Sequence, residues 1–585
     1  MPLGFPIVGI VAWFRLAYRS RGLCQNKHQS DGLFCLTNGV FKLGRATSCA
    51  VKNMTKYVFL PSLASFLFSC TLLAQEKHHH IQPLEKVGNV SFPITCDQSV
   101  QKKFERGVAL LHSFWYEEAQ KSFKEVLDQD THCVIAYWGQ AMSIYRPLWN
   151  RPTASDLRNG RKLIQVAQTF DGNSQRERDY IDALAVFYGD DNRDYQKRSA
   201  DYCDVMQKLF SQYPEDREAA VFYALALLGS QPDNDTKLEN SRKAIAILAK
   251  LFKEEPNHPG AAHYLVHAAD NPHLADLGLP AARRYAQIAP ASPHALHMPS
   301  HIFARLGLWQ EDIQSNLASI AATRQSSGMH VGAEHQIHAM DFLEYAYLQI
   351  GENNKAKAVV DHLAAIREDD VNPGLDGYLD GMRAHLPAMY ALETHQWKEA
   401  LALQPPAGAE AGSKAITYWA RAVAAGHLRD VDAARDAVEQ YDTMLDTVRK
   451  SSRPYRADFM STNGSEARAW LVFAEGKNDE ALSLLRSVAD KQDAEGKGEV
   501  ELPAREMLGD MLLEINRLRE ALAEYEKSLN TDPNRFNGLY GAARSAELLQ
   551  QPRTAARYYA QLLKNCEAPS QRPELSHAKE LLARN

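Results

Sequence analysis

The sequence predicts an all-α protein, a solenoid of helical hairpins, and two observations support this fold class. From residue 98 onward, apolar residues recur at spacings of three and four, which is the period of amphipathic helices. The helical stretches are separated by short turns and return as similar units, with no convincing run of alternating strand residues between them. Hairpins that stack in this way bury one continuous core.

The composition is that of a large globular protein. The chain has 585 residues, of which 45% are hydrophobic and 24% are charged. This length is enough for several domains or for one long repeat array. The formal net charge is only −6, and no block rich in Lys or Arg stands out. We therefore expect no nucleic-acid partner.

The first part of the chain carries the pattern of a secretory signal. Residues 54–74, MTKYVFLPSLASFLFSCTLLA, have Lys56 ahead of an apolar core and end at Ala74. This layout predicts a signal peptide that starts at Met54, with residues 1–53 an over-extension of the start site. The mature protein is then periplasmic or secreted. If the segment stays uncleaved, it is a membrane anchor instead.

A polar stretch, residues 75–97, follows the predicted cleavage point. It contains the run His78, His79 and His80. We interpret it as a flexible arm whose histidines are solvated, with capture or delivery of metal as the alternative. Farther along, Cys96 and Cys133 flank a single predicted hairpin. Because exported proteins can hold disulfides, we predict that these two cysteines are paired.

The repeat unit is clearest near the C-terminal end. Residues 518–563, LREALAEYEKSLNTDPNRFNGLYGAARSAELLQQPRTAARYYAQLL, carry Ala521, Tyr525 and Pro533 at the marker positions of one hairpin. These residues resemble the tetratricopeptide repeat (TPR), a helical hairpin of about 34 residues with a small residue where its helices touch. The resemblance covers most of residues 98–566. It implies a right-handed superhelix whose concave groove binds a protein or peptide.

This resemblance suggests a division of the chain after the arm. We expect N-terminal hairpins over 98–255, histidine-rich central hairpins over 256–366, a C-terminal TPR array over 367–566, and a C-terminal helix or tail over 567–585.

Histidines are concentrated in the central hairpins, where ten of the 21 fall between residues 258 and 341. Seven of these ten, together with two aspartates, form three stripes at helical spacing. The stripes are His263, His267 and Asp270 in "HYLVHAAD"; His294, His297 and His301 in "HALHMPSH"; and His335, His338 and Asp341 in "HQIHAMD". We expect the three stripes to lie on neighbouring first helices and to face one groove.

Two features of these stripes stay open. His263 and His297 are 34 residues apart, as one repeat predicts, but the matching turn glycines Gly307 and Gly351 are 44 apart and give a different register. Pro299 is either interior to a kinked helix that is capped by Ser292 and starts at Pro293, or it is the first residue of a helix that leaves the earlier histidines in a turn.

Neutral imidazoles and carboxylates from adjacent helices suit zinc, iron, nickel or copper. The predicted metal ligands are His263, His267, His297, His301, His335 and His338, with Asp270, His294 and Asp341 as possible additional ligands. The alternatives are packing as neutral rings or, for charged rings, binding of an anionic ligand.

A second resemblance concerns the order of the motifs. "AYWGQAM" (136–142), "HYLVHA", "HMPSHIF" and a later H-x-x-H stripe resemble exported bacterial TPR proteins of undefined role. The resemblance implies a bacterial envelope protein with the six histidines as its signature, and it supplies no reaction.

Three functions follow from these observations. The first is an exported scaffold that binds a protein, peptide or small ligand in its groove beside a metal site. The second is a metal-dependent enzyme, a hydrolase or oxidoreductase, with Asp270, Asp341 or Glu334 as candidate bases. The third is a periplasmic metal carrier. No catalytic residue is assigned, and no phosphate-binding glycine loop or G-x-S-x-G motif is present.

Overall fold

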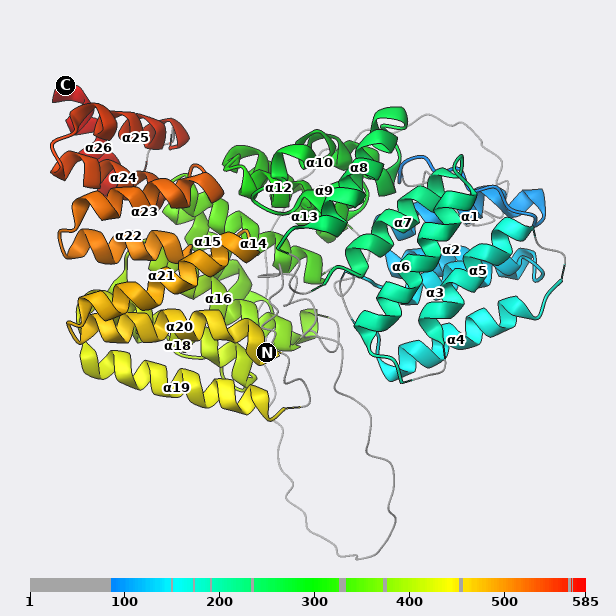
Figure 1. Ribbon diagram of the computed structural model, residues 1–585, viewed down its shortest axis with the longest axis horizontal. Coiled ribbons are helices and arrows are strands. Elements are labelled where there is room, and N and C mark those ends of the chain that lie inside the picture. The colour runs from blue at the N-terminus through cyan, green and yellow to red at the C-terminus, as the bar shows by residue number, and fades with distance from the viewer. Residues whose placement is uncertain are drawn as a thin grey trace, which may run out of the picture. The chain divides into compact units, whose positions relative to one another are not determined.

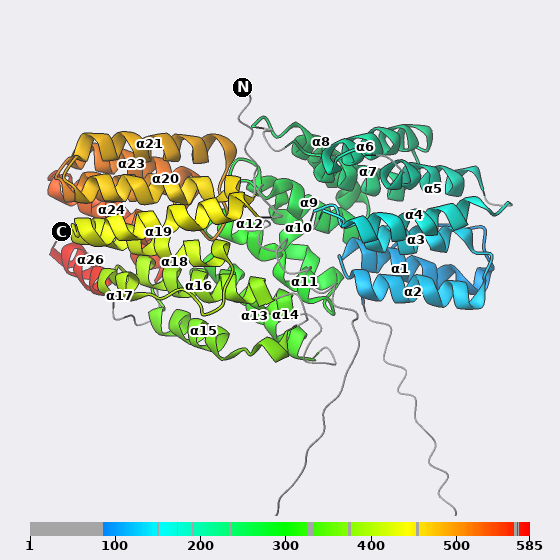
Figure 2. The same ribbon diagram turned by 90° about the horizontal axis from the view of Figure 1, so that it is seen from below.

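The computed structural model describes residues 86–148, 151–171, 174–189, 192–232, 236–325, 333–371, 376–451, 456–566, 570 and 572–584. The predicted start-site extension, the signal peptide and His78–His80 lie outside the described residues. Within the described ranges, all regular elements are helices, and consecutive helices pack against each other as hairpins (Figures 1 and 2). The predicted all-α, TPR-type solenoid is confirmed.

The N-terminal hairpins begin with a short 3-10 helix, η2 (Gln98–Val100). The α-helices that follow are α1 (Gln101–His112), α2 (Tyr116–Gln129), α3 (Val134–Ile144), α4 (Ala154–Gln168), α5 (Gln175–Tyr188), α6 (Tyr195–Gln212), α7 (Arg217–Gly229) and α8 (Glu239–Glu254).

The central hairpins carry the histidine stripes. Their helices are α9 (Pro259–Ala269), α10 (Ala275–Ile288), α11 (Pro293–His297), α12 (Pro299–Arg305), α13 (Trp309–Gln325), α14 (Ala333–Gln349) and α15 (Asn353–Ala365).

The C-terminal array follows a 3-10 turn, η3 (Glu368–Asp370). Its helices are α16 (Asp376–Glu393), α17 (Trp397–Ala402), α18 (Ala411–Leu428), α19 (Val431–Arg449), α20 (Arg456–Ala474), α21 (Asn478–Glu495), α22 (Ala504–Glu514), α23 (Leu518–Thr531), α24 (Phe536–Leu548), α25 (Pro552–Asn565) and α26 (Pro573–Arg584).

The repeats pack through an aromatic ring that faces small residues on the helices beside it. Tyr525 of α23 is fully buried against Gly509 of α22 and Gly541 of α24. A Cβ atom at Gly509 would lie 2.8 Å from the Tyr525 ring, closer than real contacts allow. Phe123 of α2 fills the same role between two first helices of the N-terminal hairpins. This close approach explains why the repeat requires a small residue where its helices touch.

The apolar core divides at α12. One large cluster of buried side chains runs from Val87 to Phe303 and another from Ala304 to Ala578, with a small separate cluster of alanines inside the second range. The histidine stripes on α9, α11, α12 and α14 therefore lie where the two cores meet.

The N-terminal arm differs from the prediction. Within residues 86–97, Val87 and Phe92 are buried, and the Phe92 ring packs 5.2 Å from the Phe104 ring. The expectation of a flexible arm was wrong for this stretch, because its apolar side chains complete the core of the first hairpins. A disulfide joins Cys96 to Cys133 and ties the end of the arm to the start of α3.

Two further features bear on the predictions. Gly307 (φ +63°) and Gly351 (φ +73°) form equivalent turns after α12 and α14, which supports the 44-residue register between those two hairpins. Among the described helices, none is both long and apolar enough to cross a membrane.

Candidate metal centre

Two of the histidine-bearing helices begin at strong N-terminal caps. The side chain of His258 accepts a hydrogen bond from the Ala261 N–H at the start of α9, and Ser292 does the same for Ala295 at the start of α11. Each cap is followed by a proline at the first helical position. These starts fix where the stripes begin on their helices.

Pro299 divides the second stripe between two helices. The helix starts at Pro293, as the first alternative expected, but α11 ends at His297, and α12 starts anew at Pro299. Because proline has no N–H, the hydrogen-bond ladder is interrupted there. Met298 between the two helices keeps helical angles (φ −52°, ψ −33°), so His297 and His301 still face each other with ring centroids 4.9 Å apart.

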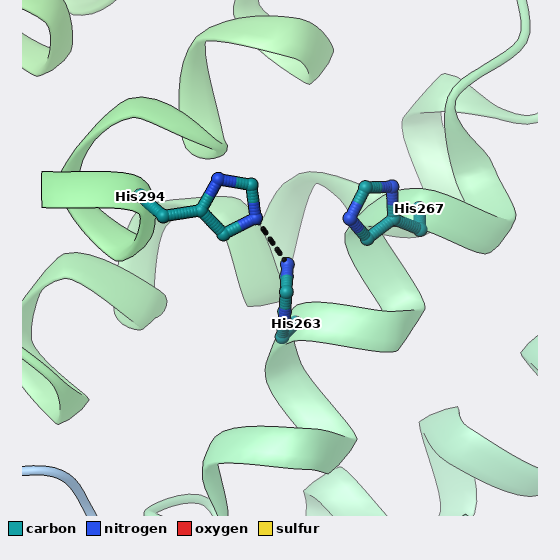
Figure 3. A group of neighbouring side chains, drawn as sticks. All are labelled: His263, His267 and His294. Carbon is teal, nitrogen blue, oxygen red and sulfur yellow. Dashed lines mark hydrogen bonds between the residues drawn. The ribbon is translucent and has the colours of Figure 1, made fainter. Parts of the chain in front are cut away.

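The first histidine group consists of His263 and His267 from α9 and His294 from α11. One ligand nitrogen from each ring lies within 4.8 Å of the others. Figure 3 shows the three rings turned toward one another, with Nε2 of His263 2.9 Å from Nε2 of His294. The ring centroids of His263 and His267 are 4.7 Å apart.

The protonation of His263 follows from its other partner. Its Nδ1 lies 2.5 Å from the backbone oxygen of His112. A carbonyl oxygen can only accept, so Nδ1 carries the proton. Burial lowers the pKa of His263 to about 3, which keeps the ring neutral near pH 7. Its Nε2 therefore presents a lone pair toward His294.

His267 adds an unsatisfied atom to the first histidine group. Its Nε2 is buried and has no hydrogen-bond partner among the described residues. Burial holds the pKa values of His267 and His294 well below the ordinary histidine value, so both rings are neutral near pH 7. Three neutral imidazoles around one point are a suitable ligand set for a transition metal.

The second histidine group consists of His297 from α11, His301 from α12 and His338 from α14. Their ligand nitrogens also lie within 4.8 Å of one another. Nε2 of His297 is 3.0 Å from Nε2 of His301, and the His338 ring centroid is 4.5 Å from that of His297. All three side chains are buried.

Asn316 of α13 orients His297. The Asn316 amide nitrogen donates to both the backbone and the side-chain oxygen of Asp312, so its Oδ1 points at His297. Nδ1 of His297 donates to that oxygen at 2.7 Å. Burial holds the pKa of His297 well below the ordinary value. Its Nε2 consequently faces His301 without a proton.

Two carboxylates orient His301. Its Nδ1 donates to Oδ2 of Asp270 at 3.0 Å and to Oε1 of Glu499 at 2.9 Å. Burial opposes a charge on this ring, but Glu499 and Asp270 together raise the pKa of His301 to about 10, so near pH 7 the metal-free ring is charged and an ion would displace its Nε2 proton. Arg305 donates to Asp270 at 3.1 Å and balances part of the acidic charge.

The remaining predicted ligands lie outside both groups. His335 packs beside His294 with ring centroids 5.4 Å apart, and Oδ1 of Asp341 is 3.3 Å from Nε2 of His385. Asp270 contacts Nδ1 of His301, whereas the second histidine group gathers around Nε2 of that ring. The three stripes therefore form two groups of three rings, and His294 belongs to the first of them.

A third histidine cluster has a different character. His112, Glu218 and His258 are all at most 1% exposed. Nε2 of His112 donates to Glu218 at 2.7 Å, and Nε2 of His258 donates to it at 3.0 Å. The Tyr264 hydroxyl donates to Nδ1 of His112, and Nδ1 of His258 caps α9. Every ring nitrogen of this cluster is committed to a protein partner.

Three residues of the centre had no signal in the sequence. Glu499 lies 198 positions from His301 in the sequence. Asn316 is a single polar residue on a helix, and no motif marks it. His112 takes part through its backbone oxygen, which no side-chain pattern can indicate. None belongs to a histidine stripe, so only the folded chain brings them to the rings.

Comparison with known proteins adds little to this geometry. No family model and no curated protein matches the sequence. Among solved structures, the chain is similar to a tetratricopeptide repeat protein from Parabacteroides merdae, at 14% identity and a TM-score of 0.25, over 50% of this chain and 97% of that one.

Two further solved structures are similar at the same low level. A human IFIT1 dimer with m7Gppp-AAAA has 12% identity and a TM-score of 0.34, over 74% of this chain and 90% of that one. The APC/C hetero-tetramer Cut9–Hcn1 has 9% identity and a TM-score of 0.30, over 83% and 89%. At these values the neighbours carry no argument about what this chain binds.

Proposed function

We propose that this protein is an exported TPR scaffold that binds a divalent transition metal at its central histidines. The observation that carries the proposal is the orientation of three rings. His263, His297 and His301 each commit Nδ1–H to a fixed acceptor and turn Nε2 toward another imidazole. Metal-binding histidines are oriented in this way, because the partner of one nitrogen fixes the tautomer and aims the other at the ion.

The spacing of the nitrogens also supports metal binding. Two nitrogens bound to one tetrahedral ion at ~2.0–2.1 Å lie about 3.3 Å apart. The facing Nε2 atoms are 2.9 Å apart in the first histidine group and 3.0 Å apart in the second. A small outward shift of either pair admits an ion. Imidazole ligands favour zinc, copper, nickel or iron.

The scaffold and export parts of the proposal rest on other observations. Stacked helical hairpins commonly offer an extended surface to a protein, a peptide or a small ligand. The Cys96–Cys133 disulfide supports export, since disulfides persist mainly in oxidising compartments. The signal pattern that begins at Met54 also supports export to the periplasm or the medium.

The proposal is tested by metal analysis of the purified protein after incubation with Zn²⁺ and dialysis. We expect bound zinc, and we expect His263→Ala with His294→Ala to lower the zinc content. His132→Ala is the matched control, because His132 is exposed and outside both groups. A wild-type protein that holds no zinc and does not change its melting temperature on zinc addition would contradict the proposal.

A metal-dependent enzyme is the second candidate, favoured by the number of ligands. Three protein ligands leave one coordination position open, as catalytic zinc sites do. Glu334 is adjacent to His335 on α14, and burial raises its pKa to about 7, within the range of a general base. Azide added to the Co²⁺-loaded protein should change its visible spectrum if a position is open, whereas a closed site gives no change.

A further inference from the structure

We propose that the two histidine groups hold two separate ions, and that Glu499 of the C-terminal array positions His301 for the second ion. This inference rests on the proposed metal binding and goes beyond it in two ways. It states the number of ions, and it assigns a positioning residue that lies about two hundred positions from the stripes in the sequence.

The separation of the ions follows from the ligand distances. An ion about 2.1 Å from each of its ligands holds them within about 4.2 Å of one another, so the rings of a set would close in slightly on binding. The ligand nitrogens fall into two sets of three, each within 4.8 Å, and not into one set of six. Each set also has its own pair of facing Nε2 atoms. We therefore infer one ion for each set rather than a single ion shared by both.

The groups differ in the charge around them. The oriented ring of the first group, His263, donates to a neutral carbonyl oxygen of His112. The oriented ring of the second group, His301, donates to Asp270 and Glu499, with Arg305 beside them. A carboxylate behind a ligating histidine fixes its ring and raises its basicity. It also offsets the charge of a buried dication, which is costly without compensation.

Glu499 reaches the site on the segment 496–503, which joins α21 to α22. Besides the contact with His301, the Lys497 backbone oxygen accepts a hydrogen bond from Arg305 at 2.7 Å. Nζ of Lys497 pairs with Asp532 at 2.6 Å and so ties the same segment to the last repeats. Glu499 is 7% exposed. The second ion is therefore linked, through one histidine, to the docking of the C-terminal array.

The test is a Co²⁺ titration of the metal-free protein, followed by visible absorption and equilibrium dialysis. We expect two ions per chain in the wild type. Glu499→Gln keeps the shape of the side chain but removes its charge, and we expect it to weaken one ion about 10- to 100-fold. The affinity of the other ion should stay unchanged, which also shows that the variant is folded.

A matched control and a complementary variant make the result specific. Glu501→Gln changes a neighbouring carboxylate that accepts a hydrogen bond from Gly498 and contacts no ring of either group, so both affinities should be unchanged. His263→Ala with His294→Ala should remove one ion and leave the other still sensitive to Glu499→Gln. Binding of the second ion should also slow hydrogen exchange in residues 496–503.

The outcomes separate this inference from the proposed function. A wild-type protein that takes up no Co²⁺ fails both. Two ions with unchanged affinities in Glu499→Gln overturn the positioning role alone. A single ion, lost equally when either histidine group is altered, overturns the two-ion assignment while leaving the proposed metal binding intact.

Discussion

Two buried histidine clusters share the α9 region, and they use their nitrogens in opposite ways. In the cluster of His112, Glu218 and His258, each ring nitrogen is paired with a carboxylate, a hydroxyl or a backbone N–H. In the first histidine group, Nε2 of His263 meets another imidazole nitrogen, and Nε2 of His267 has no hydrogen-bond partner within the described chain.

The difference teaches that burial of histidines does not by itself indicate a ligand site. Both clusters are buried except for the partly exposed His267, and both contain residues that can bind metals. The two clusters differ in the hydrogen-bond partners of their ring nitrogens. A nitrogen that already has a strong partner must lose that partner to bind an ion. We therefore assign the Glu218 cluster to stability, and the proposal of metal binding concerns the two histidine groups alone.

The largest expected effect is on the Glu218 cluster. Burial alone would raise the pKa of Glu218, but His258 and His112 lower it to about 2. Glu218→Ala leaves two buried rings without their acceptor, and we expect a loss of about 3–5 kcal/mol in the free energy of unfolding in urea. The exposed Glu215→Ala serves as control and should change little. Equal losses in the two variants would refute the structural role of Glu218.

A smaller effect is expected when the histidine groups bind metal. Zn²⁺ at a free concentration 100 times its dissociation constant should stabilise the folded chain by about 2.7 kcal/mol per site. His297→Ala with His301→Ala should remove the part of this zinc stabilisation that comes from the second histidine group. Thermal unfolding with and without Zn²⁺ measures both. Stabilisation that survives in variants of both groups would place the metal elsewhere.

Much of this comparison was accessible from the sequence, and the reasons are local. The apolar spacing of three and four predicted the hairpins, and Ala521 and Tyr525 indicated the repeat, because each depends on neighbours in one hairpin. His263 and His267 fall on one helix face by their spacing alone. These features need no knowledge of how distant segments meet.

The division into two groups could not be predicted in the same way. It depends on the break at Met298, where a proline interrupts one helix, and on the register of α14 against α11 and α12. The acceptor Glu499 comes from the segment between α21 and α22, and Asn316 comes from α13, the helix that packs on α11 and α12. Their roles arise from tertiary packing, which no periodicity in the sequence records.

The stability of the metal-free protein should depend on pH, and single histidine rings should contribute to this dependence in different ways. The folded-state pKa of His263 is about 3, below its ordinary value of 6.5, so between these values the unfolded chain binds more protons. Stability should therefore fall as the pH falls below 6.5, by about 1.4 kcal/mol per pH unit for each such histidine. Urea unfolding between pH 7 and pH 5 measures the slope.

His301 should contribute the opposite slope on the alkaline side. Its pKa is raised to about 10 in the folded chain, so its stabilisation is complete below pH 6.5 and is lost as the pH rises toward 10. Glu499→Gln should reduce this alkaline loss and leave the acid slope unchanged. A profile without a maximum near neutral pH would contradict the assigned protonation states.

The smallest expected effect comes from Tyr264, whose hydroxyl donates to Nδ1 of His112 at 3.0 Å. Tyr264→Phe removes one buried hydrogen bond and keeps the ring in place, so we expect a loss of about 1 kcal/mol in the free energy of unfolding. The zinc content should not change, because His112 uses both ring nitrogens within the protein and only its backbone oxygen orients His263. A drop in zinc content with normal stability would mean that the ring of His112 belongs to the metal centre.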